Sequence, residues 1–437
     1  MHKQILRLAI PSIITNITVP LLGMVDVAIV GHIGNADHIA AIALATMVFN
    51  LIYWNFGFLR MGTGGLTAQA CGAGDREACT AILVRGIAMA LGIAAALLLL
   101  QGPIAFCCKK LIHSSGETIA LMFSYFYIRI WAAPATLGLY VLKGWFIGMQ
   151  NARSPMVIAI VLNIVNILFS LLFVIVFHLG IEGVAWGTVI AQYSGLALAV
   201  VLWFCRYGEL RHCFRIRESL KIKEMVRFFK INTDLFLRSL CLIAVFTFIP
   251  YISAKMGNTI LAANTLLMQL FTLQSYILDG FAYAGEALTG NCIGARATQS
   301  LHRIVKQLLL WGIIFAAAFT LLYAFFGHGI FRILTNDPVV IDAAMDYLIW
   351  ALLVPVCGFA AFIFDGVYVG ATASKEMRNI MCIATAAFFI LYFLLINKLG
   401  NNAIWLAFII FLLARSLLML FKNGKVIDTA LEKTNAK

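Results

Sequence analysis

Long apolar segments, separated by short polar ones, make up most of the chain. Each has about 20 residues or more with few charges, the length that a helix needs to cross a hydrocarbon core of about 30 Å. The pattern predicts twelve membrane-spanning helices, near residues 8–30, 38–59, 82–106, 119–148, 156–178, 183–204, 229–254, 260–290, 304–326, 340–370, 376–397 and 402–421.

This pattern occurs twice along the chain. Leu66 and its neighbours align with Leu288 and its neighbours, at a shift of 222 residues (288 − 66 = 222), and the same shift places Lys143 opposite Asp365. A single offset that persists over so long a segment indicates an internal duplication, which divides the predicted helices six and six. Duplicated halves in a membrane protein are typical of transporters.

The composition excludes a soluble globule. Hydrophobic residues make up 62% of the 437 residues and charged residues 12%, with a mean hydropathy of +0.96. A chain with so few polar residues cannot cover a soluble core of this size, so we expect an all-α integral membrane protein. The net charge of +13 arises from short loops that form no continuous basic face, which favours lipid headgroups over nucleic acid as partners.

Lysine and arginine residues lie mostly in loops on one side of the predicted helices, which predicts a multi-pass protein of the plasma membrane with both termini cytoplasmic. We expect a six-helix bundle over residues 1–205, a basic cytoplasmic linker over 206–228, and a second bundle with a short tail over 229–437. The linker is expected to be long enough to tether the bundles while they rock. The first apolar segment has no cleavage pattern, so it reads as a retained helix.

Asp26 is the most informative charged residue, because it stands alone in an apolar run. A carboxylate costs several kcal/mol in hydrocarbon, about 3 on insertion scales, unless it faces a cavity or a partner. Pro20 removes a backbone donor and lets the helix bend, so proton or cation binding at Asp26 could be coupled to helix geometry. The alternative is a carboxylate that is merely solvated at the outer mouth.

A second polar group lies in the fifth predicted helix. Asn163, Asn166 and Ser170 follow one another at spacings of three and four, and so share a helix face, while the sixth helix offers Thr188. With Asp26 they would form an oxygen-rich pocket for a monovalent cation or a relayed proton. Ordinary interhelical hydrogen bonds are the alternative.

Other ionisable residues within the predicted helices are candidates for a substrate cavity. Asp279 and Glu286 lie two helical turns apart, and Arg238 could neutralise either of them. Structural ion pairs are the alternative role. Arg129 is also embedded, and Arg60 and Arg415 could extend their side chains to an interface. The cavity candidates are Lys143, Arg238, Asp279, Tyr283, Glu286 and Asp365, the tyrosine as a ring for cation–π contact with organic cations.

The remaining residue types favour neither an enzyme nor a metal protein. The ten cysteines have no metal-ligand spacing, and the eight histidines lie near loops without a ligand-like cluster. We therefore expect no cofactor and no metal. A flippase for lipid-linked precursors is an alternative transporter, but it would need a strongly cationic cavity, and the embedded basic residues are matched or outnumbered by acids.

Several strings resemble the multidrug and toxic compound extrusion (MATE) transporters, and most closely their DNA-damage-inducible protein F (DinF) branch. The resemblance spans about residues 5 to 420. The strings that carry it are residues 17–26 with Gly31 and His32, 58–61 with 64–70, 278–284 with Glu286, and Asp365 and Gly366 with 370–372 and 376–379.

This resemblance implies two pseudo-symmetric six-helix bundles, alternating access, and export of organic compounds in antiport with H⁺ or Na⁺. The family's first-helix carboxylate falls on Asp26, and its cation-site asparagine and threonine fall on Asn166 and Thr188. Its second acid falls on Ser170, a departure that favours H⁺ over Na⁺. The expected partners are a small organic, cationic or amphipathic substrate and membrane lipids, with the chain acting as a monomer.

Overall fold

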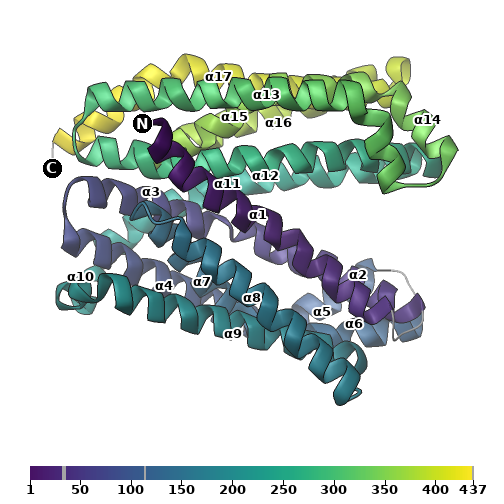
Figure 1. Ribbon diagram of the computed structural model, residues 1–437, viewed down its shortest axis with the longest axis horizontal. Coiled ribbons are helices and arrows are strands. Elements are labelled where there is room, and N and C mark those ends of the chain that lie inside the picture. The colour runs from purple at the N-terminus through teal and green to yellow at the C-terminus, as the bar shows by residue number, and fades with distance from the viewer. Residues whose placement is uncertain (32–35, 113–114, 436–437) are drawn as a thin grey trace. The chain divides into compact units, whose positions relative to one another are not determined.

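The computed structural model describes residues 1–31, 36–112 and 115–435, and within them it contains helices and no strand. Figure 1 shows their order along the chain. The helices are α1 (His2–Gly31), α2 (Ala36–Asn55), α3 (Phe58–Gly72), α4 (Arg76–Leu99), α5 (Gln101–Leu111), α6 (Gly116–Arg129), η1 (Ile130–Ala132), α7 (Ala133–Gly148), α8 (Arg153–Leu171), η2 (Leu172–Val176), α9 (Gly180–Tyr207), η3 (Gly208–Cys213), α10 (Ile216–Ser219), α11 (Ile222–Lys255), α12 (Asn258–Gly294), α13 (Thr298–Leu334), α14 (Pro338–Asp346), α15 (Leu348–Gly370), α16 (Ser374–Leu399) and α17 (Asn401–Asn435).

The helices confirm the predicted membrane architecture. In the described part of the chain, eleven helical segments are long and apolar enough to cross a bilayer, and each overlaps one predicted span. The remaining predicted span coincides with α1. Several predicted boundaries were wrong. The second segment continues through α3 to Gly72, and the third ends at Leu99, where a separate helix, α5, begins. The tenth is divided between α14 and α15, and the twelfth continues to Asn435.

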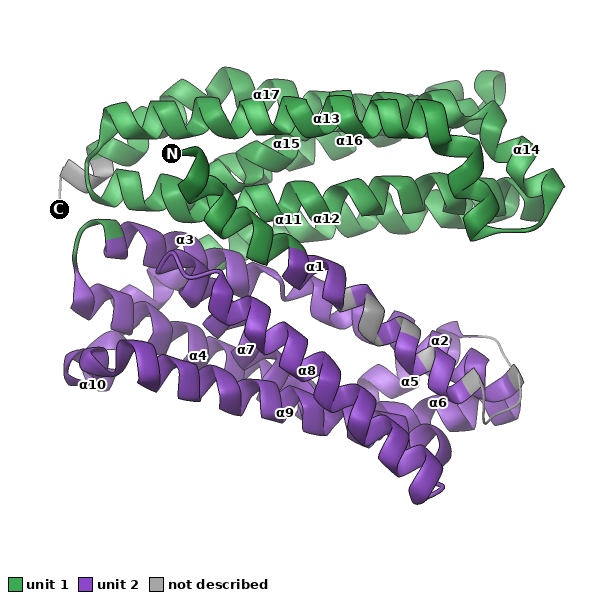
Figure 2. Cartoon of the chain, in the orientation of Figure 1, with its two compact units in different colours: residues 1–13, 72–74, 230–437 green, residues 14–71, 75–229 purple. Residues whose placement is uncertain are grey.

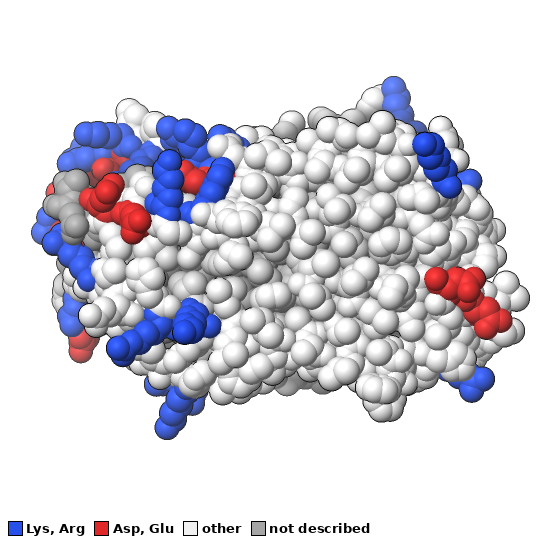
Figure 3. Space-filling view, turned by 90° about the horizontal axis from the view of Figure 1, so that it is seen from above, with Lys and Arg blue, Asp and Glu red and all other residues white. Residues whose placement is uncertain are grey.

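Charged side chains follow the same pattern on the molecular surface. On the face in Figure 3, Lys, Arg, Asp and Glu gather toward the two ends of the molecule and leave a broad band of other residues between them. An uncharged belt of this kind matches the hydrocarbon region of a bilayer.

The described helices form two compact units, coloured in Figure 2. Unit 1 contains residues 1–13, 72–74 and 230–437, and unit 2 contains residues 14–71 and 75–229. The chain therefore passes from unit 1 to unit 2 within α1 and returns to unit 1 within α11. The sequence placed the start of the second bundle at residue 229, which also lies in α11. The first turns of α1 pack on α12, where an added Cβ at Gly280 would lie 3.0 Å from the carbonyl oxygen of Ala9.

The internal duplication is visible in how helices approach one another within each unit. In unit 2 an added Cβ at Gly148 would lie 2.6 Å from the carbonyl oxygen of Gly64. In unit 1 an added Cβ at Gly370 would lie at the same distance, 2.6 Å, from that of Glu286. Both members of the second pair are shifted by 222 residues (370 − 148 = 222; 286 − 64 = 222), so the two halves repeat the same contact, which only glycine permits.

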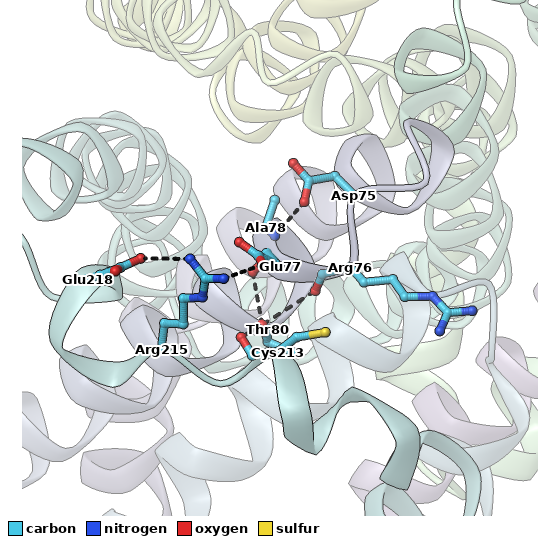
Figure 4. Close-up of polar contacts among 8 residues, drawn as sticks. All are labelled: Asp75, Arg76, Glu77, Ala78, Thr80, Cys213, Arg215 and Glu218. Atoms are coloured by element: carbon cyan, nitrogen blue, oxygen red, sulfur yellow. Dashed lines mark hydrogen bonds and ion pairs between the residues drawn. The ribbon is translucent and has the colours of Figure 1, made fainter.

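The basic segment between the halves is folded, which the sequence did not predict. Residues 206–229 contain the end of α9, η3, α10 and the start of α11, and all belong to unit 2. They pack on the first turns of α4, where Thr80 Oγ1 donates to the carbonyl oxygen of Cys213 at 3.1 Å and Arg215 pairs with Glu77 at 3.0 Å (Figure 4). Arg85 Nε donates to the carbonyl oxygen of Ser219 at 2.8 Å. The linker that we expect to tether the bundles is therefore itself folded, and its tethering role stays a prediction.

Candidate functional site

Asp26 is buried within unit 2, with 3% of its surface exposed. The side chains of Asn166, on α8, and Thr188, on α9, lie near its carboxylate. Asn166 Nδ2 also donates to Thr188 Oγ1 at 3.0 Å, and Thr188 Oγ1 bonds the carbonyl oxygen of Val184 one turn earlier at 3.0 Å. Three helices therefore meet near one carboxylate, and these residues, so far apart in sequence, lie together in the structure.

Ser170 extends this polar pocket by one turn of α8. The helix approaches α9 so closely that an added Cβ at Gly187 would lie 2.4 Å from Ser170 Oγ. Among the described residues, Oδ1 of Asp26, Oδ1 of Asn166 and Oγ of Ser170 are buried and have no hydrogen-bond partner. Buried acceptors are nearly always satisfied, so three without a partner indicate a place where a proton or a small ligand can be held.

Asn163 makes a different contact from its neighbours on α8. Its Nδ2 donates to the backbone carbonyl oxygen of Thr18 on α1, at 2.9 Å, two residues before Pro20. It therefore ties α8 to α1 near the proline. The helix is continuous from His2 to Gly31 through Pro20, so bending there stays a prediction.

The structure adds Arg129 to this site, a residue that the sequence analysis placed in the membrane without a role. Its guanidinium attracts the Asp26 carboxylate electrostatically. Nη1 donates to the hydroxyl of Tyr125 at 2.9 Å, and the guanidinium lies 4.8 Å from the ring centre of Phe49 and 5.5 Å from that of Tyr125. The spacing of Tyr125 and Arg129, one helical turn, was the only sequence signal, and it does not connect either of them to Asp26.

Unit 1 contains a separate buried ion cluster around Asp365. The carboxylate Oδ2 pairs with Arg238, from α11, and with Arg415, from α17, the latter at 2.8 Å. The side chains of Arg238 and Arg415 are 6% and 3% exposed, so the expectation that Arg415 extends to an interface was wrong. Asp279 adds a further negative charge near Arg415. Asp365, the duplicate of Lys143, is thus held by two arginines of its own unit.

The remaining cavity candidates lie on α7 and α12. Lys143 is half-buried on α7, in unit 2, and forms no ion pair or hydrogen bond with any described residue. Tyr283 is half-buried on α12 and Glu286, on the same helix, is 1% exposed, both within unit 1. No group of three or more His, Cys, Asp or Glu in the described parts of the chain could hold a metal ion.

Both halves of the chain match one protein family. The MatE family model matches residues 11–172 and 235–396, more than half of the chain. The DNA damage-inducible protein F of Escherichia coli (strain K12) is 37% identical to it, over 95% of this chain and 90% of that protein. The chain belongs to the MatE family. The resemblance found in the sequence is confirmed, and with it the assignment as a membrane transporter rather than an enzyme.

Other MatE relatives and structures agree on the fold. A probable multidrug resistance protein NorM of Acinetobacter baylyi (strain ATCC 33305 / BD413 / ADP1) is 24% identical over 96% of this chain and 95% of its own length. The crystal structure of MATE in the bent conformation superposes with a TM-score of 0.87, at 18% identity, covering 100% of this chain and 97% of that one. An outward-facing multidrug resistance MATE family transporter of the MOP superfamily gives 0.88 at 17% identity, covering 98% and 96%. The MATE fold is therefore confirmed.

Proposed function

We propose that this MatE protein exports organic, mainly cationic or amphipathic compounds from the cytoplasm by alternating access, in antiport with H⁺. The observation that carries the proposal is the buried Asp26 carboxylate with an unpartnered oxygen, inside a membrane helix. Related proteins named as multidrug resistance proteins support the substrate class.

A proton suits the polar pocket around Asp26 because it changes both charge and hydrogen bonding there. The ionised carboxylate accepts hydrogen bonds only, whereas the protonated carboxyl also donates one. Protonation therefore alters how Asp26 on α1 can interact with the neighbouring Asn166 on α8 and Thr188 on α9. Helix α1 contributes residues to both units and contains Pro20. A change in the interactions of Asp26 can therefore be transmitted as a change in the bending of this helix.

The half-buried charged and aromatic residues support an amphipathic substrate. Lys143 in unit 2, and Asp279 and Tyr283 in unit 1, combine charge with apolar or aromatic surface. In unit 1 the embedded carboxylates Asp279, Glu286 and Asp365 outnumber the arginines Arg238 and Arg415, which favours cations. The unpaired Lys143 instead suits an anionic headgroup, so a flippase of lipid-linked precursors is the second candidate function.

Orientation belongs to the same proposal. The basic residues of the folded linker and of both termini favour the cytoplasmic side of a bacterial inner membrane for these segments, because anionic lipids there attract them. Export then moves the substrate away from that side while protons move toward it.

Transport by the purified protein in liposomes tests the proposal. The vesicles are loaded with a fluorescent organic cation, and a pH gradient or a sodium gradient is imposed separately. We expect movement under the pH gradient alone, loss of that movement in Asp26→Asn, and normal movement in the matched control Asp342→Asn, a change at an exposed residue of α14. Movement under sodium alone would refute proton coupling. Movement under neither gradient would favour the flippase.

A further inference from the structure

We propose that the first turns of α11 bind the headgroup of an anionic phospholipid, with the acyl chains lying along an exposed apolar stripe of the same helix. Basic loops in general attract anionic lipids and so orient a membrane protein. The proposal is a discrete lipid site in unit 2, which depends on neither the transported compound nor the coupling ion.

Two basic side chains on one face of α11 form the charged part of this site. Lys223 and Arg227 are exposed and four residues apart, so they lie one above the other on the helix. Neither forms an ion pair or a hydrogen bond with a described residue. Arg217 and Lys221 add exposed positive charge just before the helix begins. Lysine and arginine are the usual protein partners of a phosphate group.

The acidic side chains of the same segment already have other partners. Residues 206–229 contain seven basic residues and three acids. The three acids form the ion pairs Glu209 with Arg76 at 3.8 Å, Glu218 with Arg215 at 3.5 Å and Glu224 with Arg85 at 3.5 Å. Figure 4 shows the second of these pairs. The acids are thus held by arginines outside the basic pair Lys223 and Arg227, which leaves that pair to a phosphate.

An apolar stripe runs beside the basic pair. Ile222, Val226 and Phe229 are 83%, 60% and 49% exposed, and their spacings of four and three residues place them on one face. Each basic residue directly follows an apolar one, so the two faces are about 100° apart around the helix. Exposed apolar side chains beside unpaired basic ones suit a phospholipid, which has an acyl part and an anionic part, better than a soluble anion.

The length of α11 places this site at the surface of the bilayer. The helix has 34 residues. At 1.5 Å per residue this is about 50 Å, whereas the hydrocarbon core is about 30 Å thick. The charged first turns therefore extend into the headgroup layer. Side chains of a helix tilt toward its N-terminus, so Lys223 and Arg227 lean toward the phosphates and away from the hydrocarbon.

Contacts inside unit 2 hold these first turns in place. Phe228 is 2% exposed, so it faces inward and fixes the rotation of the helix. Arg85 Nε donates to the carbonyl oxygen of Ser219 at 2.8 Å and holds the segment that leads into it. Both faces of the site therefore point outward before a lipid arrives, and binding orders little more than the two basic side chains.

Lipid binding by the purified full-length protein in detergent tests the inference. Phosphatidylglycerol is titrated in parallel with phosphatidylcholine of the same acyl chains. The rise in melting temperature gives the apparent affinity, and native mass spectrometry counts the retained lipids. We expect saturable stabilisation by phosphatidylglycerol alone. Lys223→Gln/Arg227→Gln should weaken its affinity about tenfold or more, because each basic residue near a lipid surface contributes about a factor of five.

Matched variants separate this site from general attraction by net charge. Lys422→Gln/Lys425→Gln removes the same charge from exposed residues of α17 and should leave the affinity unchanged. Lys223→Arg/Arg227→Lys keeps both charges and should bind as the native protein does. Should the glutamine double variant not fold, Lys223→Gln and Arg227→Gln alone should each weaken binding about fivefold. Glycerol phosphate, an anion without acyl chains, should not stabilise the protein.

Three results would overturn the inference. Equal weakening by the two glutamine double variants would leave net charge as the only cause. Equal stabilisation by phosphatidylglycerol and phosphatidylcholine would remove the role of the anionic headgroup. Stabilisation by glycerol phosphate would indicate a site for soluble anions instead. None of these measurements uses transport, so their outcome is independent of the proposed function.

Discussion

At the scale of single residues, burial decides what a charge does in this protein. Asp26 and Asp365 are both carboxylates inside membrane helices, and Oδ1 of each is buried without a hydrogen-bond partner among the described residues. Asp365, however, pairs through Oδ2 with two arginines, while Asp26 forms no ion pair with a described residue. The first arrangement stabilises one conformation, and the second leaves room for a proton. The two carboxylates are therefore suited to different roles, and the sequence had already separated them: Asp26 was a candidate for ion coupling and Asp365 a candidate for the substrate cavity.

Asp365→Asn should be strongly destabilising. It leaves Arg238 and Arg415 buried beside each other without their shared counter-charge, and breaking a buried pair in this way costs about 3–5 kcal/mol. Arg215→Gln removes a pair with Glu77 whose side chains are 56% and 57% exposed, and should cost less than about 1 kcal/mol. Chemical denaturation in detergent, followed by tryptophan fluorescence, compares the free energies of unfolding. Equal losses would contradict this assignment.

At the scale of helices, close approach through glycine determines which helices can pack together. The carbonyl oxygen of Ala282 on α12 faces Gly366 of α15, and that of Arg60 on α3 faces Gly144 of α7. These pairs are again related by 222 residues (366 − 144 = 222; 282 − 60 = 222). The duplication is therefore preserved as a backbone contact while the neighbouring side chains, Lys143 and Asp365, have opposite charges.

Gly366→Ala should disrupt the contact of α12 with α15. The new Cβ would overlap the carbonyl oxygen of Ala282, a backbone atom that does not move independently, so we expect a loss of about 1–3 kcal/mol or more in the free energy of unfolding. Gly92→Ala in α4, where nothing lies within 4 Å, should be neutral or stabilising by about 0.4–1 kcal/mol. Melting curves of both variants in the same detergent make the comparison, and similar melting temperatures would refute the close contact.

The folded linker makes a prediction at the same scale. Arg85→Gln removes the bond to the carbonyl oxygen of Ser219 and the ion pair with Glu224 at 3.5 Å, so trypsin should cut more rapidly between residues 206 and 221. Arg76→Gln removes only a 3.8 Å pair between exposed side chains, with Glu209, and should leave the cleavage rate unchanged. Cleavage is followed by mass spectrometry. Equal rates in Arg85→Gln and the native protein would show that these contacts do not hold the linker.

At the scale of the whole molecule, the distribution of charge along the chain predicts its orientation in the membrane. Alkaline phosphatase, which is active only outside the cytoplasm, should be active when fused after Gly257, in the turn between α11 and α12. Fused after the C-terminus it should be inactive, whereas a fluorescent protein at that end should fluoresce. Enzyme activity and fluorescence in intact cells provide the readout. The reverse pattern would invert the proposed topology.

Much of the architecture could be predicted because a bilayer imposes simple rules on sequence. Apolar length sets the helices, and the 222-residue repeat sets their division into halves. The sequence predicted two kinds of feature poorly. They are the helix ends at Leu99 and Gly72 and the folding of residues 206–229. These features depend on caps and contacts such as Thr80 with Cys213, which hydropathy does not report.

By itself, the sequence determined the membrane fold, the duplication and the isolation of Asp26 in an apolar helix, because hydrophobicity and spacing along the chain are local properties. It also indicated Asn166 and Thr188 through the family resemblance. Only the tertiary structure decided which charges meet: Arg238 and Arg415 with Asp365. These partners lie on different helices, and the free energy of a buried charge depends on distances in space that helix packing alone establishes.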